Sequence, residues 1–112
     1  MVKLTEINLL YDFYGQMLTE RQRKFIELYY GDDFSLGEIA EQFEVSRQSV
    51  HDILKRSEQT LYRFEEKLGL VGKSKKQRDQ LTNAISHLNS GSESGVRSAK
   101  QILTQLIQDE ED

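Results

Sequence analysis

Residues 35–56, SLGEIAEQFEVSRQSVHDILKR, contain two helix starts separated by a tight turn, and no other stretch constrains the fold as strongly. Ser35 is followed three residues later by Glu38, the spacing of a capping box, and Ser46 is a good N-cap for a second helix. The apolar residues of the two helices are spaced to pack against each other: Ile39, Ala40, Phe43, Val50, Ile53 and Leu54. A short helix, a sharp turn and a longer helix predict an all-α, helix-turn-helix fold.

The turn between these helices departs from the usual pattern at one position. Such turns often carry glycine, because a residue without a Cβ atom enters the left-handed region at no steric cost. Glu44 occupies that position in this chain, at a cost of roughly 1 kcal/mol. The sequence therefore predicts a positive φ at Glu44, and it places the small side chain of Ala40 where the two helices cross.

The outward face of the second helix is polar. Its residues are Arg47, Gln48, His51, Asp52, Lys55 and Arg56. Arg and Gln side chains can make bidentate contacts with base edges, and Lys and Arg side chains suit phosphates. Asp52 counts against this interpretation because phosphates repel a carboxylate, although a carboxylate can accept a hydrogen bond from a cytosine amine. The pattern favours nucleic-acid contact, and the alternative is a solvated face on a helix that merely completes a bundle.

Composition sets limits on the class of protein. With 112 residues the chain is large enough for one domain with a real core. The net charge of −4 weakens the DNA interpretation, because small DNA-binding domains are usually basic. Residues 1–80 hold thirteen Lys and Arg against fourteen Asp and Glu, which places most of the acidity in the tail. The chain has no Cys, no apolar run of signal-peptide type and no stretch of membrane-spanning length, so we expect a cytoplasmic protein without a membrane partner.

Two helices are expected before the central motif. Thr5 caps a first helix that runs to about Tyr14, and a second capping box, Thr19 with Gln22, starts a helix that ends at Gly31. Basic residues cluster on the first turns of that second helix: Arg21, Arg23 and Lys24. They are candidates for contacts with a phosphate backbone, and a solvated face is the alternative.

The second helix of the motif is expected to continue to Leu68 and to end at Gly69. Apolar residues recur along it at spacings of three and four, interrupted by one serine: Val50, Leu54, Ser57, Leu61, Phe64 and Leu68. A helix of this length spans roughly 33 Å, so its far half needs a packing partner. The candidates are the helices after Gly72 and a second subunit in a homodimer, and the intrachain arrangement is favoured.

The chain therefore divides into a helix-turn-helix domain, residues 1–72, and a C-terminal helical extension, residues 73–112, packed on the same core. The extension opens with the basic connection GKSKKQR, whose Lys73, Lys75 and Lys76 either contact phosphates or simply solvate a helix start. Two more helices follow, joined by a flexible link over residues 89–95.

No catalytic constellation is visible in the sequence. His51 and His87 are far apart along the chain and have no thiol partners. We therefore expect neither a metal site nor a cofactor, and we do not expect an enzyme.

Residues Leu18 to Leu61, LTERQRKFIELYYGDDFSLGEIAEQFEVSRQSVHDILKRSEQTL, resemble region four of bacterial sigma factors. In that family the matching helix contacts a promoter element. The resemblance implies base or backbone contacts for Arg47, Gln48, His51 and Lys55. His51 and Asp52 depart from the more basic pattern usual there, and nothing in the chain resembles the region that melts promoters.

Over nearly its full length the chain resembles the YlxM-like family of small bacterial helix-turn-helix proteins. The segment EINLLYDFYGQMLTERQRKFIELYYGDDFSLGEIAEQFEVSRQSVHDILKR carries the resemblance most specifically. It implies a regulatory role in the signal recognition particle pathway, with the particle's RNA, its GTPase or DNA as partner. A sequence-specific DNA-binding transcriptional regulator is the alternative, and a protein–protein adaptor stays open because fold alone does not define function.

Overall fold

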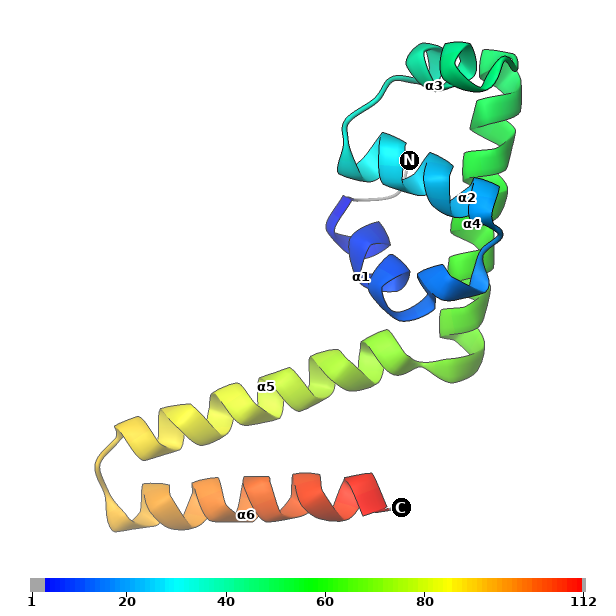
Figure 1. Ribbon diagram of the computed structural model, residues 1–112. Coiled ribbons are helices and arrows are strands. Elements are labelled where there is room, and N and C mark those ends of the chain that lie inside the picture. The colour runs from blue at the N-terminus through cyan, green and yellow to red at the C-terminus, as the bar shows by residue number, and fades with distance from the viewer. Residues whose placement is uncertain (1–3, 112) are drawn as a thin grey trace. The chain divides into compact units, whose positions relative to one another are not determined.

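The computed structural model describes residues 4–111, which form helices and turns without a β-strand (Figure 1). The elements in order are α1 (Leu4–Tyr14), the 3-10 turn η1 (Gly15–Met17), α2 (Glu20–Ile26), the π-helical turn η2 (Glu27–Gly31), α3 (Leu36–Phe43), α4 (Arg47–Leu68), α5 (Leu70–Asn89) and α6 (Glu93–Glu111). The predicted all-α, helix-turn-helix fold is confirmed for these residues. Two compact units make up the chain, residues 1–71 and 72–112.

The caps of the short helices form as their sequence predicts. Thr19 accepts from the backbone N–H of Gln22, and the Gln22 side chain accepts from the Thr19 N–H, so α2 begins with a complete capping box. Ser35 and Glu38 make the same pair of bonds at the start of α3. The assignment of Thr5 as a cap is wrong, because α1 already includes Leu4 and Thr5 lies in its first turn.

The core of the first unit forms around α4, the long green helix in Figure 1. Its fully buried side chains come from every helix of the unit: Ile7, Tyr14, Phe25, Ile39, Val50, Ser57 and Leu61. Ser57, which interrupts the apolar seam, donates its hydroxyl to the carbonyl oxygen of Ile53 at 2.7 Å, so its polar atom is satisfied inside the core. Its small side chain belongs to the interior of the unit.

The far half of α4 packs on α1, a partner that the sequence analysis did not consider. The Tyr14 ring stacks on Phe64 with centroids 6.0 Å apart, and the Tyr14 hydroxyl donates to Glu65 Oε1 at 2.6 Å. The same hydroxyl accepts from the N–H of Leu70, and Glu65 Oε1 accepts from the N–H of Val71. These bonds tie the end of α1 to the end of α4 and to the first two residues of α5. The packing of the C-terminal helices on α4 stays a prediction.

Between α2 and α3 the chain makes a π-helical turn where a plain helix to Gly31 was expected. The N–H of Asp32 reaches back five residues to the carbonyl of Glu27, and Phe34 reaches back to Leu28. This wider turn lets three consecutive side chains, Leu28, Tyr29 and Tyr30, all pack partly against the core. Asp33 then takes a positive φ of 59° as the chain turns toward Ser35.

The second unit is a helical hairpin of α5 and α6, which run antiparallel (Figure 1). Its turn depends on Gly91, with φ 72°, and on Ser92, which caps α6 by accepting from the Gly95 N–H at 3.0 Å. Gly95 is needed because a Cβ atom there would collide with the His87 carbonyl oxygen and with Ser90 Oγ.

Two boundary predictions for the C-terminal part are wrong. The basic stretch at residues 72–78 lies inside α5, which starts at Leu70, so Gly69 alone interrupts the helices. The link expected over residues 89–95 is limited to residues 90–92, because Ser92 starts α6 one residue before Glu93.

Candidate nucleic-acid interface

The turn of the motif has the backbone that the sequence predicted. Glu44 lies in the left-handed region, with φ 56° and ψ 46°. The N–H of Val45 donates to the Ala40 carbonyl at 3.0 Å, and the N–H of Glu44 donates to the Glu41 carbonyl. These two bonds form a Schellman motif, which usually carries glycine where this chain has Glu44. The turn is thus fixed by hydrogen bonds although its key residue has a Cβ atom.

Ser46 then starts α4, and buried residues further along this helix determine which of its faces is exposed. Its backbone is extended, and its side chain accepts from the Ser49 N–H at 3.0 Å. Val50 and Leu54 are buried on one side of α4. The side chains predicted to contact nucleic acid lie on the other side. His51 is half-buried there, and the other five are exposed: Arg47, Gln48, Asp52, Lys55 and Arg56.

Arg47 lies against the backbone of α3 at Gly37. A Cβ atom built on Gly37 would sit 3.1 Å from both Arg47 Nε and Arg47 Nη2. The absence of a side chain at Gly37 therefore makes room for the guanidinium. Sequence reasoning did not select Gly37, and its only signal was an interior glycine in a short helix, where glycine costs helix stability.

Three neighbouring polar side chains on α4 interact with one another. Gln48 Nε2 donates to Asp52 Oδ1 at 2.9 Å, one helical turn away. Asp52 Oδ1 also lies 3.6 Å from His51 Nδ1. Asp52 thus holds the Gln48 amide along the helix surface. For Gln48 to contact a base edge with its amide N–H, this intrahelical bond must exchange for the new one.

One basic residue of α2, Arg21, lies close to the middle of α4. Arg21 and Arg56 line a small open groove of about 150 Å³ together with Thr19, Gln22 and Ile53. The Arg21 guanidinium also lies over the rings of Phe25 and Phe43, at 5.7 and 5.9 Å from their centroids. Arg21 therefore has a structural role besides its predicted phosphate contact.

The remaining predicted basic residues lie elsewhere. Arg23 is half-buried near Tyr11, and Lys24 is exposed on α2. Lys73, Lys75 and Lys76 are exposed on α5, in the second unit. That part of α5 is level with the acidic end of α6, because the two helices of the hairpin are antiparallel. At this end of the hairpin the positive charges of α5 are therefore offset by the negative charges of α6.

Acidic residues concentrate in the unit that carries the motif. Residues 1–71 hold nine Lys and Arg against thirteen Asp and Glu, and residues 72–112 hold six of each. The whole formal charge of −4 therefore belongs to the first unit. Three of its carboxylates are exposed on or just after α3, beside the start of α4: Glu38, Glu41 and Glu44. The tail after residue 80 is acidic as expected, but the basic residues at positions 72–80 belong to the same unit and offset it. The excess of acidic residues therefore lies in the first unit when the chain is divided between the two units.

Within residues 4–111 no three His, Asp or Glu side chains are grouped so that they could hold a metal ion. None of the helices in the described part of the chain combines the length and the hydropathy that crossing a membrane requires.

The fold and the exposed face of α4 define a helix-turn-helix protein. The family described as "Putative helix-turn-helix protein, YlxM / p13 like", UPF0122, matches residues 1–102, and the chain belongs to this family. A UPF0122 protein of Desulforamulus reducens is 52% identical over 117 aligned residues, covering 100% of this chain and 99% of the relative. The UPF0122 protein YlxM of Bacillus subtilis is 51% identical, with 80% of this chain and 81% of the relative covered. A UPF0122 protein of Halalkalibacterium halodurans is 54% identical over 74% of this chain and 79% of its own length.

Proposed function

We propose that this protein is a non-enzymatic, cytoplasmic regulator that binds nucleic acid with the exposed face of α4. The observation that carries the proposal is the orientation of α4 after Ser46. Val50 and Leu54 are locked in the core, and Arg47 and Lys55 of the same turns are exposed. A helix held in this way can present Arg47 and Lys55 to a groove without a change of its backbone.

The chemistry of the face suits duplex DNA. The major groove of B-form DNA admits an α-helix, and Arg47 at the first turn is placed for the base-edge contacts that arginine makes with guanine. Arg56 and Arg21, which line one groove, suit phosphates on the flanking backbone. The carboxylates near α3 repel phosphates, so we expect affinity to depend on a few well-placed cations and to fall with added salt.

Fluorescence anisotropy with labelled duplexes tests this proposal. Replacing Arg47 and Lys55 together by Ala should weaken binding by roughly tenfold or more. The matched control is the double change of Arg63 and Lys67 to Ala, which removes the same charge from exposed positions at the far end of α4. The control should bind within roughly threefold of the original protein. Equal losses in both variants would show that binding depends only on overall charge, and no binding at low salt would exclude the proposal.

The proposed link to the signal recognition particle rests on the family resemblance. The particle's RNA and its GTPase are the proposed partners. The major groove of an A-form helix is too narrow for α4, so an RNA target would offer a loop or a widened groove. Mobility shifts with the particle's RNA and pull-downs with its GTPase test the link. Absence of both interactions at micromolar protein and low salt would refute it.

Sequence-specific regulation of transcription is the second candidate function. It uses the same face of α4 and is favoured by the fit of an exposed helix to the major groove. Selection from a pool of random duplexes should then enrich one sequence, and Arg47→Ala should relax the preference at a defined base pair. A pool without enrichment, together with tight binding to the particle's RNA, would favour the first candidate.

A protein–protein adaptor is a further candidate, because the first unit is acidic around α3. In that case Glu38 and Glu41, exposed on α3, would face a basic partner. Substituting both by Gln should then weaken capture of the GTPase and leave any binding to nucleic acid unchanged or stronger. The opposite pattern would eliminate the adaptor.

A further inference from the structure

The helical hairpin of the second unit buries small residues and leaves large apolar residues in water. Ala84 of α5 and Ala99 of α6 are almost completely buried. Six of the larger apolar residues that flank them are 38–62% exposed: Leu81, Ile85, Leu88, Val96, Leu103 and Ile107. The alanines are therefore among the best-covered residues of the hairpin, and the longer apolar side chains project beside them into water.

Helix geometry puts these six side chains on one side of the hairpin. At about 100° per residue, Leu81, Ile85 and Leu88 lie about 40–100° from Ala84 in one rotational sense. On α6, Val96, Leu103 and Ile107 lie about 40–80° from Ala99 in the same sense. Because the two helices run in opposite directions, both sets turn toward the same side. We call this surface the apolar face of the hairpin.

The area of the apolar face is large for a surface left in water. Six aliphatic side chains at about half exposure leave roughly 500 Å² uncovered, near the upper end for the largest apolar patch of a monomer. Two such faces packed together would bury roughly 1,000 Å² in total, which is about the minimum for a specific protein–protein interface.

We propose that the apolar face is the docking surface for a second copy of this chain, so that two hairpins form a four-helix bundle. A hairpin of two helices cannot enclose a core alone, and a four-helix bundle is the standard packing solution for helices with one apolar side. In a twofold-symmetric pair each copy offers the same face, so the same apolar face meets itself.

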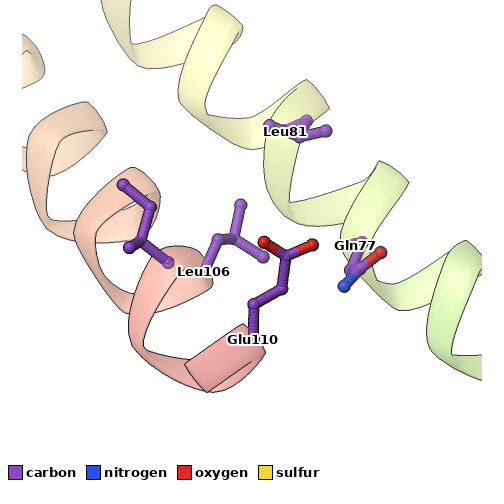
Figure 2. A pocket seen from close by; sticks show the side chains of 5 residues that line it. Gln77, Leu81, Leu106 and Glu110 are labelled. Carbon is purple, nitrogen blue, oxygen red and sulfur yellow. The ribbon is translucent and has the colours of Figure 1, made fainter. Parts of the chain in front are cut away.

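A recess in the hairpin is consistent with this arrangement. A cavity of about 200 Å³ opens between α5 and α6, lined by Gln77, Leu81, Leu106, Ile107 and Glu110. In Figure 2 Gln77 and Glu110 lie at this recess beside the apolar side chains. The side chains of the hairpin leave the recess open, and an aliphatic side chain of the partner copy would fill it, as knobs fill holes between packed helices.

The distribution of charge favours a second copy as the occupant. One end of the hairpin carries both signs, with Lys73 and Lys76 at the start of α5 and Asp109 and Glu110 at the end of α6. When the twofold axis is parallel to the helices, α5 of one copy lies against α6 of the other with these ends level. Each basic segment then faces the partner's acidic segment, so the surface is complementary to itself.

Analytical ultracentrifugation of the full chain over a roughly hundredfold range of concentration tests the proposal. The original protein should dimerise. The double variant Ile85→Glu with Leu103→Glu should weaken the dimer by at least roughly tenfold, because it places carboxylates in the apolar face. The control variant, Asn83→Glu with Gln101→Glu, adds the same charge at exposed polar positions of the same helices and should dimerise as before. Circular dichroism checks that all three proteins have the same helix content.

Cysteine cross-linking gives a second readout that does not depend on a charged core variant. The chain has no Cys, so single substitutions report without background. Chains with Leu81→Cys mixed with chains carrying Leu103→Cys should form disulfide-linked pairs on mild oxidation, and a mixture of Asn83→Cys with Gln101→Cys should not.

Three outcomes would overturn the proposal. One is a protein that stays monomeric at the highest concentration. Another is a dimer that the Ile85 and Leu103 variant leaves intact, which would place the interface elsewhere. The last is a monomer whose first unit is destabilised by that variant, because the apolar face would then be covered by the rest of its own chain.

Discussion

Glu44 holds a conformation that suits glycine, and Glu44→Gly should therefore stabilise the first unit. Glu44 has φ 56° at the Schellman turn between α3 and α4, and its side chain is exposed. Glycine at this position keeps the backbone bonds from Glu44 and Val45 to α3, because those bonds use main-chain atoms only.

The expected gain follows from two opposing effects. An L-residue in the left-handed region is strained by roughly 1–2 kcal/mol, and this strain disappears in the variant. Glycine adds freedom to the unfolded chain, which offsets roughly 0.5–1 kcal/mol. The free energy of unfolding should therefore rise by roughly 0.5–1 kcal/mol. For a unit of this size that is a rise in Tm of roughly 2–8 °C.

Urea unfolding followed by tyrosine fluorescence measures the change in the relevant unit. The chain has five Tyr and no Trp, and every Tyr lies before residue 72. The signal therefore reports the first unit alone. Glu44→Ala is the charge control, since it removes the carboxylate and keeps the Cβ atom. It should stay within about 0.5 kcal/mol of the original protein.

Gly69→Ala is the reverse experiment. Gly69 has φ 63° at the end of α4, and a Cβ atom there would meet no other atom within 4 Å. The only cost of alanine is therefore backbone strain, and the variant should lose roughly what Glu44→Gly gains. If Glu44→Gly proves neutral or destabilising while Gly69→Ala destabilises, strain at Glu44 cannot be the controlling term, and this reasoning fails.

Three other changes have defined outcomes. Burial and hydrogen bonds to glutamates raise the pKa of Tyr11 and of Tyr62 to about 12. The contribution of these tyrosines to the stability of the first unit is therefore complete below about pH 10 and is lost as the pH rises toward 12. Equal urea midpoints by circular dichroism at about pH 8 and about pH 11 would contradict this. Gly37→Ala should displace the Arg47 guanidinium and weaken duplex binding by less than Arg47→Ala does, without lowering the urea midpoint, because alanine favours the helix over glycine. Gly95→Ala should reduce the helical circular dichroism signal, because its Cβ atom collides with backbone at the hairpin turn.

Local signals in the sequence were sufficient for much of the fold. The two capping boxes, the start of α4 at Ser46 and the left-handed Glu44 all depend on residues within five positions of one another. Short-range hydrogen bonds determine such features, and they are readable from residue type and spacing. The same holds for the end of α4 at Gly69.

Features that depend on distant contacts were not predictable in the same way. The packing of Tyr14 on α4 joins residues fifty or more positions apart, and a helical period shows only that Tyr14 has an apolar side. The contact of Arg47 with Gly37 requires the crossing of two helices, which no spacing rule supplies.

The π-helical turn η2 has a consequence for how the motif tolerates changes in length. It holds one residue more than an ordinary turn between the carbonyl of Glu27 and the N–H that pairs with it, at Asp32. Deleting a single residue there would restore an α-helical turn and rotate everything after it by roughly 100° relative to α2. The length of the segment from Gln22 to Ser35 therefore sets the orientation of α3 and α4 relative to α2, and a homologue with a shorter segment would need another way to orient α4.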